Sequence, residues 1–449
     1  MAKWDVIVVG AGLSGLGVGA LLANAGKKTL VLEKENHIGG RAFSRNYKGH
    51  VLDNGVHGPS RAGYLEDIFA ELGRPYPSIG PLYNKGEIFI DGTWKDINSI
   101  YPHTELRGII ENIANSSYEE LEKYDAMSIK DWVSTKTDNE GIHYFFWHWA
   151  VGACVGNRFG SLSASETLIT IKQQLDRRGK LAGIGPIIGG VSKLTEPMAD
   201  VIREKEGDIR TGIKVSSIVI EGGKVLGVEI ETGEKVIPSQ LVDTELIEAP
   251  VVVSTLPLWD LFTIVSEDEF PRWYTDWIEA IHWKISNVWS VIHATDQPLW
   301  DESTMRWVPK LPRSQIVGYF MWFPTYGESV GQYQVHFFTQ GLWDELPSVF
   351  QMNRARTRRQ IATLLDLFEE DIEELFPDLK KHSLWKVRQA SAYSISQAPS
   401  LVGKFRPQIQ VPGVDNLYLV SDTVREARGP GMQAVANAVL QCADLILGK

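Results

Sequence analysis

The sequence is poor in cysteine, in positive charge and in long apolar runs, and each shortage excludes a class of protein. Only Cys154 and Cys442 occur among 449 residues, so no disulfide framework is expected and a reducing cytoplasm fits. The net charge of -11 argues against nucleic acid and anionic membranes as partners. Uninterrupted apolar runs of about 18 or more residues are absent, which argues against a membrane-spanning helix.

The composition is that of an ordinary globular protein, with 43% apolar and 22% charged residues. The length allows two or three domains and a large core. Lys3 precedes an apolar stretch that could be mistaken for a signal peptide. Asp5 and a series of glycines interrupt that stretch, so we interpret it as mature structure.

A glycine-rich turn follows a short apolar segment near the amino end. Residues 6–9 are all Val or Ile, which is typical of a strand buried on both faces. Gly10, Gly12 and Gly15 then follow at the spacing G-x-G-x-x-G. The first allows a tight turn, the second lets a pyrophosphate approach the backbone, and the third lets the next helix pack closely. That helix would direct its N–H groups and the positive end of its dipole at the phosphates.

A carboxylate stands where the ribose of a dinucleotide needs an acceptor. The stretch Leu16–Ala25 is helix-like, Gly26 ends it, and a second apolar strand over 29–32 leads to Glu33, roughly 20 positions after the glycines. These features predict a dinucleotide site. The alternative is a glycine-rich turn in an ordinary α/β domain, which leaves the register of Glu33 unexplained.

Further motifs resemble those of the FAD-dependent amine oxidase and phytoene desaturase superfamily. They are Gly39-Gly40-Arg41, the stretch 52–58, Ser421-Asp422, and the Gly-Pro-Gly-Met that opens the last helix at 429–432. An arginine at position 41 can approach and pair with the pyrophosphate. Where some relatives carry a cysteine linked to flavin, this chain has Ala392. The resemblance therefore implies non-covalent FAD.

The resemblance also implies which residues form the site, and no metal site is predicted. Asp422 would meet the ribityl chain, and Val215 would meet the adenine through its backbone. The start of the last helix would stabilise negative charge on reduced flavin. The expected FAD contacts are Gly10, Gly12, Leu13, Ser14, Gly15, Glu33, Lys34, Gly40, Arg41, Gly55, Val56, His57, Val215, Ser254, Asp422, Gly431 and Met432. The expected catalytic or substrate-orienting groups are His57, Tyr393 and Glu426, while Arg425 and Arg428 would hold a substrate carboxylate or the flavin phosphate region.

The implied fold is α/β, with a Rossmann-like FAD-binding domain of the glutathione-reductase type that is discontinuous in sequence. This domain would comprise residues 1–62, 186–258 and 386–449. Residues 63–185 and 259–385 would form an α+β substrate-binding domain with an antiparallel sheet. Local patterns predict helices over 64–72, 106–124, 129–135, 194–205 and 431–446, a hairpin over 87–94, and strands over 213–220, 224–231, 234–237, 251–257, 288–293, 316–322 and 333–338.

Two further stretches have competing interpretations. The aromatic cluster over 144–149 is either the lining of an apolar substrate cavity or plain core, and core is the commoner outcome. A helical pair over 352–376 begins with Arg354, Arg356, Arg358 and Arg359 and continues into Glu369–Glu374. Such a basic cluster can bind phosphates or a membrane surface, but the alternation of signs favours a solvated face. Peripheral membrane contact is thus left open.

Two departures from the resembling family bear on the chemistry. Many flavin amine oxidases carry a lysine near the flavin, where this chain has Ser290 and keeps Lys284 out of register. Monoamine oxidases flank the flavin with two tyrosines, whereas here Tyr393 fills one place and Gly431 stands at the other. We therefore expect a dehydrogenase or desaturase that removes a hydride from a largely apolar small molecule.

Three alternatives to this function are a flavin amine oxidase that forms an imine and hydrogen peroxide, a redox-neutral flavin isomerase, and a binding protein like the Rab GDP-dissociation inhibitors. The last class binds lipidated proteins without flavin and has a degraded phosphate loop. The intact glycines, Glu33 and Asp422 disfavour it.

Overall fold

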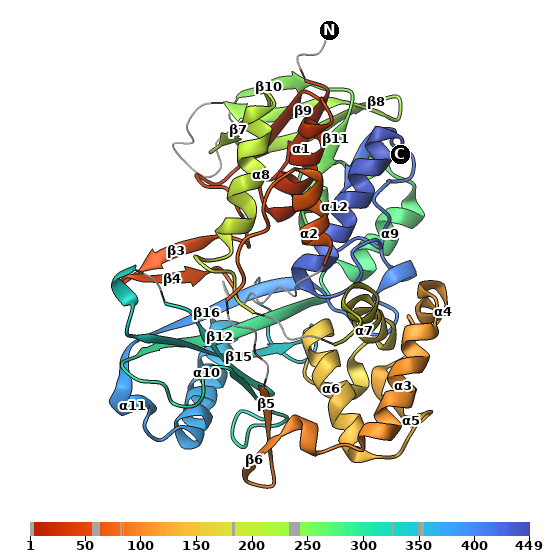
Figure 1. Cartoon of the computed structure of the whole chain (residues 1–449). Helices are drawn as coiled ribbons and strands as arrows, with labels where there is room; N and C mark the ends of the chain where they lie inside the picture. Colours follow the sequence, from red (N-terminus) through yellow and green to blue (C-terminus); the bar gives the residue numbers. More distant parts are fainter. Residues whose placement is uncertain are drawn as a thin grey trace.

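The structure is a computed structural model that describes residues 4–55, 63–80, 83, 85–181, 185–232, 243–325, 327–348, 350 and 354–449. It has two lobes (Figure 1). The upper lobe contains a parallel sheet covered by helices, and the lower lobe contains a large sheet beside a group of helices. The α/β fold class expected from the sequence is confirmed.

The parallel sheet draws its strands from widely separated parts of the chain. Apolar, β-branched residues make β1 and β2 continuous buried strands, as expected for a sheet covered on both faces. Strand β1 lies between β2 and β11, with Ile7 aligned with Leu30 and Val252. In spatial order the strands are β17 (Leu417–Leu419), β11 (Val252–Ser254), β1 (Val6–Val9), β2 (Thr29–Glu33) and β7 (Asp208–Thr211).

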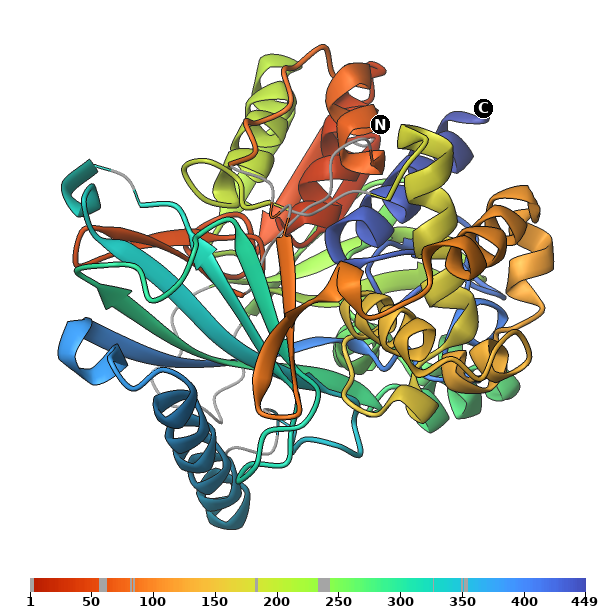
Figure 2. The same cartoon turned by 60° about the horizontal axis from the view of Figure 1, so that its bottom comes forward.

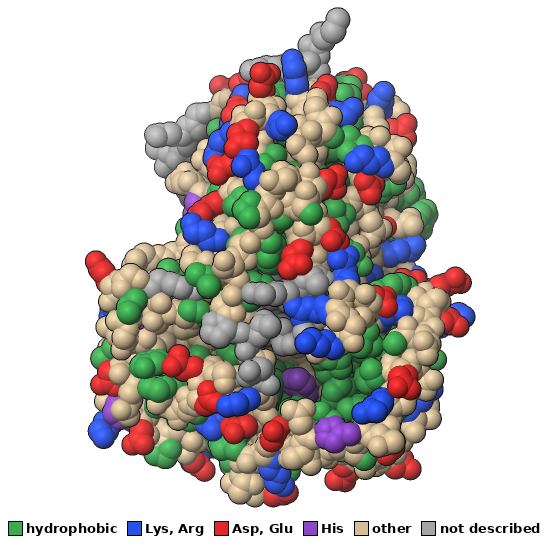
Figure 3. All heavy atoms as spheres, in the orientation of Figure 1, with side chains coloured by type: hydrophobic (Ala, Val, Ile, Leu, Met, Phe, Trp, Pro, Cys, Tyr) green, Lys and Arg blue, Asp and Glu red, His purple; other side chains and the backbone are tan. Residues whose placement is uncertain are grey.

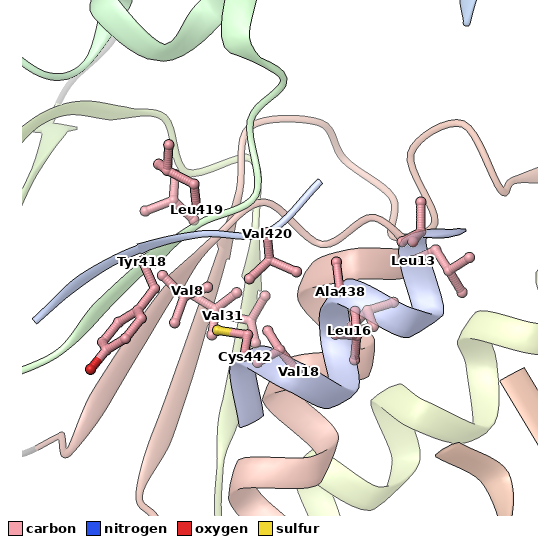
Figure 4. Packing of buried hydrophobic residues seen from close by; sticks show 14 of the residues in the cluster. Val8, Leu13, Leu16, Val18, Val31, Tyr418, Leu419, Val420, Ala438 and Cys442 are labelled. Atoms are coloured by element: carbon pink, nitrogen blue, oxygen red, sulfur yellow. The ribbon is translucent and has the colours of Figure 1, made fainter. Parts of the chain in front are cut away.

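Helices from both ends of the chain pack together on this sheet. Helix α12 (Gly431–Leu447) lies against α1 (Leu13–Asn24) so closely that a β-carbon on Gly17 would come 3.1 Å from Val439 Cγ1. Figure 4 shows Ala438 and Cys442 of α12 close to Val18 of α1, beside the strands that carry Val8 and Val31. The other helices of this lobe are α2 (Tyr64–Glu71), α8 (Ser192–Glu204) and α9 (Arg272–Ile281).

Two small sheets accompany the parallel one. The three-stranded sheet, in the order β10-β9-β8, consists of β8 (Val215–Glu221), β9 (Lys224–Thr232) and β10 (Asp243–Glu248). The strand expected over 234–237 lies outside the described residues. The hairpin β3 (Ser44–Tyr47) and β4 (His50–Asp53) leads from the glycine-rich region toward the lower lobe.

The lower lobe is built on a seven-stranded sheet whose strands fan out in Figure 2. All neighbouring strands are antiparallel except β13 and β5. In spatial order they are β16 (Ser383–Ile395), β12 (Ile285–Thr295), β15 (Tyr333–Gly341), β14 (Gly318–Phe323), β13 (Thr304–Val308), β5 (Lys85–Ile90) and β6 (Thr93–Asp96). The predicted domain boundary at 386 falls inside β16, so we propose that the substrate lobe extends to Ile395.

Helices cover the sides of the large sheet. Residues 355–375 form one helix, α10 (Ala355–Leu375), rather than the expected pair, and α11 (Leu379–His382) follows it. The single helix expected over 106–124 is two, because Ser117 and Glu120 form a capping box that starts a new helix. The remaining helices are α3 (His103–Asn115), α4 (Tyr118–Glu122), α5 (Ile129–Ser134), α6 (Glu140–Cys154) and α7 (Ala164–Arg178).

Within the described residues, no helix has the length and apolar character needed to cross a membrane. The same part of the chain holds no group of three His, Cys, Asp or Glu side chains that could bind a metal ion.

Candidate functional site

In the glycine-rich turn between β1 and α1, a β-carbon would clash with neighbouring atoms at two of the three glycines and would find open space at the third. Gly10 has a φ of +103°, and a β-carbon there would come within 2.5 Å of the Thr255 hydroxyl oxygen. A β-carbon on Gly15 would overlap the carbonyl oxygen of Gly10. At Gly12 a β-carbon would meet nothing within 4 Å. The turn therefore presents bare backbone bordering open space, as a phosphate-binding loop requires.

The first turn of α1 begins at this open position without a side-chain cap. Its N-cap residue is Gly12, which has no side-chain oxygen to accept the free N–H groups. Leu13, Ser14 and Gly15 form the start of the helix, where the dipole adds partial positive charge. An anion beside Gly12 would satisfy these donors.

Glu33 stands at the carboxyl end of β2 and is bound to the glycine-rich turn. Its Oε2 accepts a hydrogen bond from the Ala11 amide at 2.8 Å, and its Oε1 accepts one from the Glu35 amide at 2.9 Å. Only 8% of the residue is exposed. Each carboxylate oxygen keeps a second lone pair, so the fixed group can still accept a hydrogen bond from a ribose hydroxyl.

The segment around Gly40 packs directly onto the same turn. The Gly39 amide donates to the Ala11 carbonyl at 2.8 Å, and a β-carbon on Gly40 would lie 3.3 Å from Gly12 Cα. Gly40 has a φ of +55°, a conformation that glycine adopts without strain. The residue after it, Arg41, is thereby held beside the open position.

Arg41 joins the amino-terminal region to the carboxyl-terminal one. Its guanidinium donates to both carboxylate oxygens of Asp422, at 2.8 and 2.9 Å, and also to the backbone carbonyl of Tyr393. The paired residues are 381 positions apart in the sequence. The structure thus brings the residues predicted to meet the pyrophosphate and the ribityl chain into one neighbourhood, paired with each other.

The backbone of Asp422 is fixed by a buried arginine to which sequence reasoning gave no role. The Asp422 carbonyl accepts from Arg406 Nη1 at 3.1 Å and from Ser394 Oγ at 2.8 Å. Arg406 also donates to the carbonyls of Leu401 and Ile395, and it is 1% exposed. These bonds tie the end of β16 to the segment that carries Asp422.

Tyr393 and the start of α12 meet at the other side of this neighbourhood. Gly431 has a φ of +47°, and a β-carbon there would lie 3.1 Å from the Tyr393 hydroxyl oxygen, which is hydrogen-bonded to the Gly431 backbone. Burial raises the pKa of Tyr393 above its ordinary value, and the charge of Asp422 adds to the shift. The phenol is therefore neutral at pH 7. Met432 follows at the helix start and packs partly buried against the core.

The other predicted contacts are placed as follows. Ser254 ends β11, is fully buried, and its hydroxyl has no hydrogen-bond partner among the described residues. Val215 starts β8 and is buried, and Lys34 is exposed. Gly55 closely follows β4, whereas Val56 and His57 lie outside the described residues.

The contacts of Glu426, which was predicted as a catalytic candidate, indicate a structural role. Its Oε2 accepts a hydrogen bond from the Ile409 amide at 3.2 Å, and burial raises its pKa. Its charge also acts on Cys442, which lies 11 positions past the start of α12 in the packed interior. The Glu426 carbonyl also accepts a hydrogen bond from Asn437 Nδ2 of α12 at 3.0 Å, so both its backbone and its side chain have protein partners.

Arg428 is engaged in a buried ion cluster rather than facing a ligand. It pairs with Glu166 at 2.7 Å and with Asp125 at 3.0 Å, and all three side chains are at least 91% buried. Glu166 also accepts from the Gly429 amide at 3.1 Å, just before the N-cap residue Pro430 of α12. The cluster therefore holds the helical part of the lower lobe against the start of α12. No motif around Asp125 or Glu166 indicated it.

The structure also places the residues at the expected lysine position and those of the aromatic cluster. Ser290 is 3% exposed on β12, and Lys284 instead lies with its Nζ 6.0 Å from the centre of the Trp343 ring. In the aromatic cluster over 144–149, Phe145, Phe146 and Trp147 are buried core, whereas the other three are partly exposed.

Together, the parallel sheet, the bare turn at Gly12 and the carboxylate of Glu33 define a dinucleotide-dependent enzyme. The chain belongs to the flavin-containing amine oxidoreductase family, whose sequence model matches residues 13–447. FAD is accordingly its cofactor, and the open cradle at Gly12 and the fixed Glu33 fit the pyrophosphate and ribose of that group. The predicted superfamily, the cofactor and the oxidoreductase class are confirmed.

Two proteins similar to this chain catalyse different types of reaction, a desaturation and an isomerisation. It is 24% identical over 264 residues to a 4,4'-diapophytoene desaturase from Methylomonas sp, a match that covers 51% of this chain and 51% of the desaturase. It is 21% identical to the chloroplastic prolycopene isomerase of Daucus carota, with 99% of this chain and 80% of the isomerase covered.

The fold is shared with solved structures over nearly the whole chain. An oxidoreductase from Methanosarcina mazei superposes with a TM-score of 0.72 at 19% identity, covering 99% of this chain and all of that one. At that identity the likeness extends to the fold alone.

Proposed function

We propose that this enzyme is a dehydrogenase or desaturase that removes a hydride from a largely apolar small molecule. The observation that carries the proposal is Ser290, which occupies the place where many flavin amine oxidases have a lysine. It is buried on β12 between Phe338 of β15 and Gln389 of β16 in the sheet register. A serine hydroxyl at this place does not supply the charge or the proton affinity of a lysine amine.

The apolar core of the helical part of the lower lobe reaches strand β12, which pairs with the strand that carries Tyr393. Val288 packs against the helical core, and its partner in β16 is Ser391, two residues before Tyr393. Burial lowers the pKa of His148, which lies against Trp307, to about 4, so this histidine is neutral at pH 7. Figure 3 shows hydrophobic side chains gathered in a hollow in the lower half of the molecule. These surroundings favour an apolar substrate over one with a permanent charge.

The chain's own residues would bind and orient the substrate, and they would exclude water from it. FAD supplies the hydride acceptor when it is bound. Tyr393, protonated at pH 7, can hydrogen-bond to a substrate group, and the start of α12 stabilises negative charge close to Gly431. His57 stays a candidate for proton transfer, and we assign no catalytic role to Glu426. Because Ala392 offers no thiol, we propose that acid precipitation releases all FAD from the protein.

The experiment is anaerobic reduction of the purified yellow holoenzyme by two compound panels. Polyenes and terpenes should bleach the flavin absorbance, while primary and secondary amines should not. Bleaching by amines with hydrogen peroxide formed in air would overturn the proposal in favour of an amine oxidase. An isomerised polyene without net bleaching would overturn it in favour of a redox-neutral isomerase.

A further inference from the structure

Four arginines crowd the start of α10, and all of them are exposed. None of Arg354, Arg356, Arg358 and Arg359 is joined to an acidic side chain by an ion pair within the described part of the chain. The solvated-face interpretation relied on the acidic residues farther along the helix. Those residues pair elsewhere: Glu369 with Lys386 and Arg388, Glu373 with Lys380, and Glu374 with Arg313.

The position of these arginines on the helix is electrostatically unfavourable. Arg354 is the N-cap residue of α10, and the first turn contains no acidic residue. Cations at the positive end of a helix dipole lower the stability of the helix. The net charge of -11 disfavours an anionic partner for the molecule as a whole, so an anion would have to be attracted locally, at this unpaired basic group that also opposes the helix dipole.

Exposed aromatic side chains lie next to this basic group. Trp283, Trp343 and Phe350 are 59%, 47% and 43% exposed. The ring centres of Trp283 and Phe350 are 6.4 Å apart, and Lys284 Nζ lies 6.0 Å from the centre of the Trp343 ring. We call these three aromatic residues and the four arginines the aromatic–basic patch.

The two halves of the patch come close along the chain at Phe350. Phe350 is only four positions before Arg354, so the chain between them spans at most about 14 Å. Pro347, three positions before Phe350, lines a surface hollow of about 560 Å³ together with Arg356 and Arg359. Phe350, with Trp283 against it, therefore lies within about 14 Å along the chain of the arginines at the start of α10.

We propose that the aromatic–basic patch docks this enzyme on the surface of an anionic lipid bilayer. Tryptophan favours the boundary between headgroups and acyl chains, and arginine pairs with lipid phosphates. Tryptophan beside arginine also occurs in protein interfaces and at nucleic-acid sites, so binding to an acidic protein or a nucleic acid is kept as an outcome of the test. The attachment is peripheral and requires no spanning helix. It is independent of which substrate the enzyme oxidises.

The test is flotation of the holoenzyme with lipid vesicles, one set of pure phosphatidylcholine and one with about 30% phosphatidylserine. The enzyme should float with the anionic set only, and rising salt should release it. The variant R354Q/R356Q/R358Q/R359Q should lose about 1,000-fold in vesicle affinity, because each arginine near the surface contributes about 1 kcal/mol. The matched control is R107Q/K123Q/K130Q/K180Q, which removes four exposed cations from the helical part of the lower lobe and should bind as the unaltered enzyme does.

A second measurement follows the tryptophans directly. Anionic vesicles with brominated acyl chains should quench part of the fluorescence of the 15 tryptophans, and W283F/W343F should remove that part. Equal affinity for neutral and anionic vesicles, equal loss in both arginine and control variants, or unchanged quenching in W283F/W343F would each overturn the proposal. So would retention on heparin or an acidic protein without vesicle binding. Flavin content of each variant shows that it is folded.

Discussion

Gly12 and Gly15 lie three positions apart in the same turn, but the structure leaves space for a side chain at Gly12 and none at Gly15. A β-carbon at Gly15 would overlap backbone, whereas one at Gly12 would enter open space. Gly15→Ala should therefore destabilise the protein even without cofactor. Gly12→Val should leave the apoprotein folded and abolish FAD binding, because the side chain fills the space for the pyrophosphate. Thermal unfolding of the apoproteins and the ratio of flavin to protein absorbance measure the two effects. A normal flavin content in Gly12→Val would contradict the assignment of this turn.

At the residue scale, His148 makes the free energy of unfolding depend on pH. Burial lowers its pKa to about 4 in the folded protein, against about 6.5 in the unfolded chain. Below pH 6.5 the unfolded chain binds the proton more readily, so the stabilisation present above that pH is lost as the pH falls toward 4. His148→Gln should flatten the fall in unfolding free energy between pH 7 and 4.5, measured by urea denaturation. The exposed His103→Gln serves as the control and should leave the slope unchanged.

At the scale of elements, the ion cluster around Arg428 holds α7 and the α4–α5 loop against the start of α12. Removing one partner leaves a buried charge uncompensated, which costs about 3 kcal/mol or more of unfolding free energy. Arg428→Met and Glu166→Gln should each show this loss in chemical denaturation. The triple variant R428M/E166Q/D125N should recover part of it. Loss of the exposed Arg272–Asp276 pair in Arg272→Gln should cost less than about 1 kcal/mol.

Elements defined by neighbouring residues are the ones that the sequence predicts best. The glycines, the apolar strands and Glu33 lie within some 30 positions, and each feature constrains the next. Strand β16 was not predicted, because polar and charged residues occupy much of it and only its pairing with β12 makes it a strand. Strand β7, Asp-Ile-Arg-Thr, was not predicted for the same reason.

Contacts between distant residues were beyond prediction from one sequence. Asp125 and Arg428 are 303 positions apart, and nothing local distinguishes a buried ion partner from a ligand-binding arginine. The pairing of Arg41 with Asp422 was not predicted for the same reason: a motif identified each residue separately, and neither motif indicated that the two side chains meet. Glu426 was predicted as a substrate-orienting or proton-transfer group, and its carboxylate binds the backbone of Ile409, a partner 17 positions away that no local pattern indicates.

At the scale of the whole molecule, the cofactor site is assembled from separate stretches that must act together. FAD binding should slow amide hydrogen exchange at the same time in residues 6–15, 33–41 and 422–432. At a concentration 100 times its dissociation constant, FAD should add about 2.7 kcal/mol to the unfolding free energy. Gly12→Val should remove the protection in all three stretches. Protection confined to one of them would contradict a shared site.

The order of strands in the parallel sheet also bears on how the protein is made. Strand β11 pairs with β1 on one side and with β17 on the other. A ribosome must add about 160 residues after β11 before β17 emerges, a delay on the order of 10 s at usual elongation rates. During that time the nascent chain carries an apolar strand with one open edge, which can pair with another polypeptide. Production of this flavoenzyme should therefore depend on chaperones that shield the growing chain.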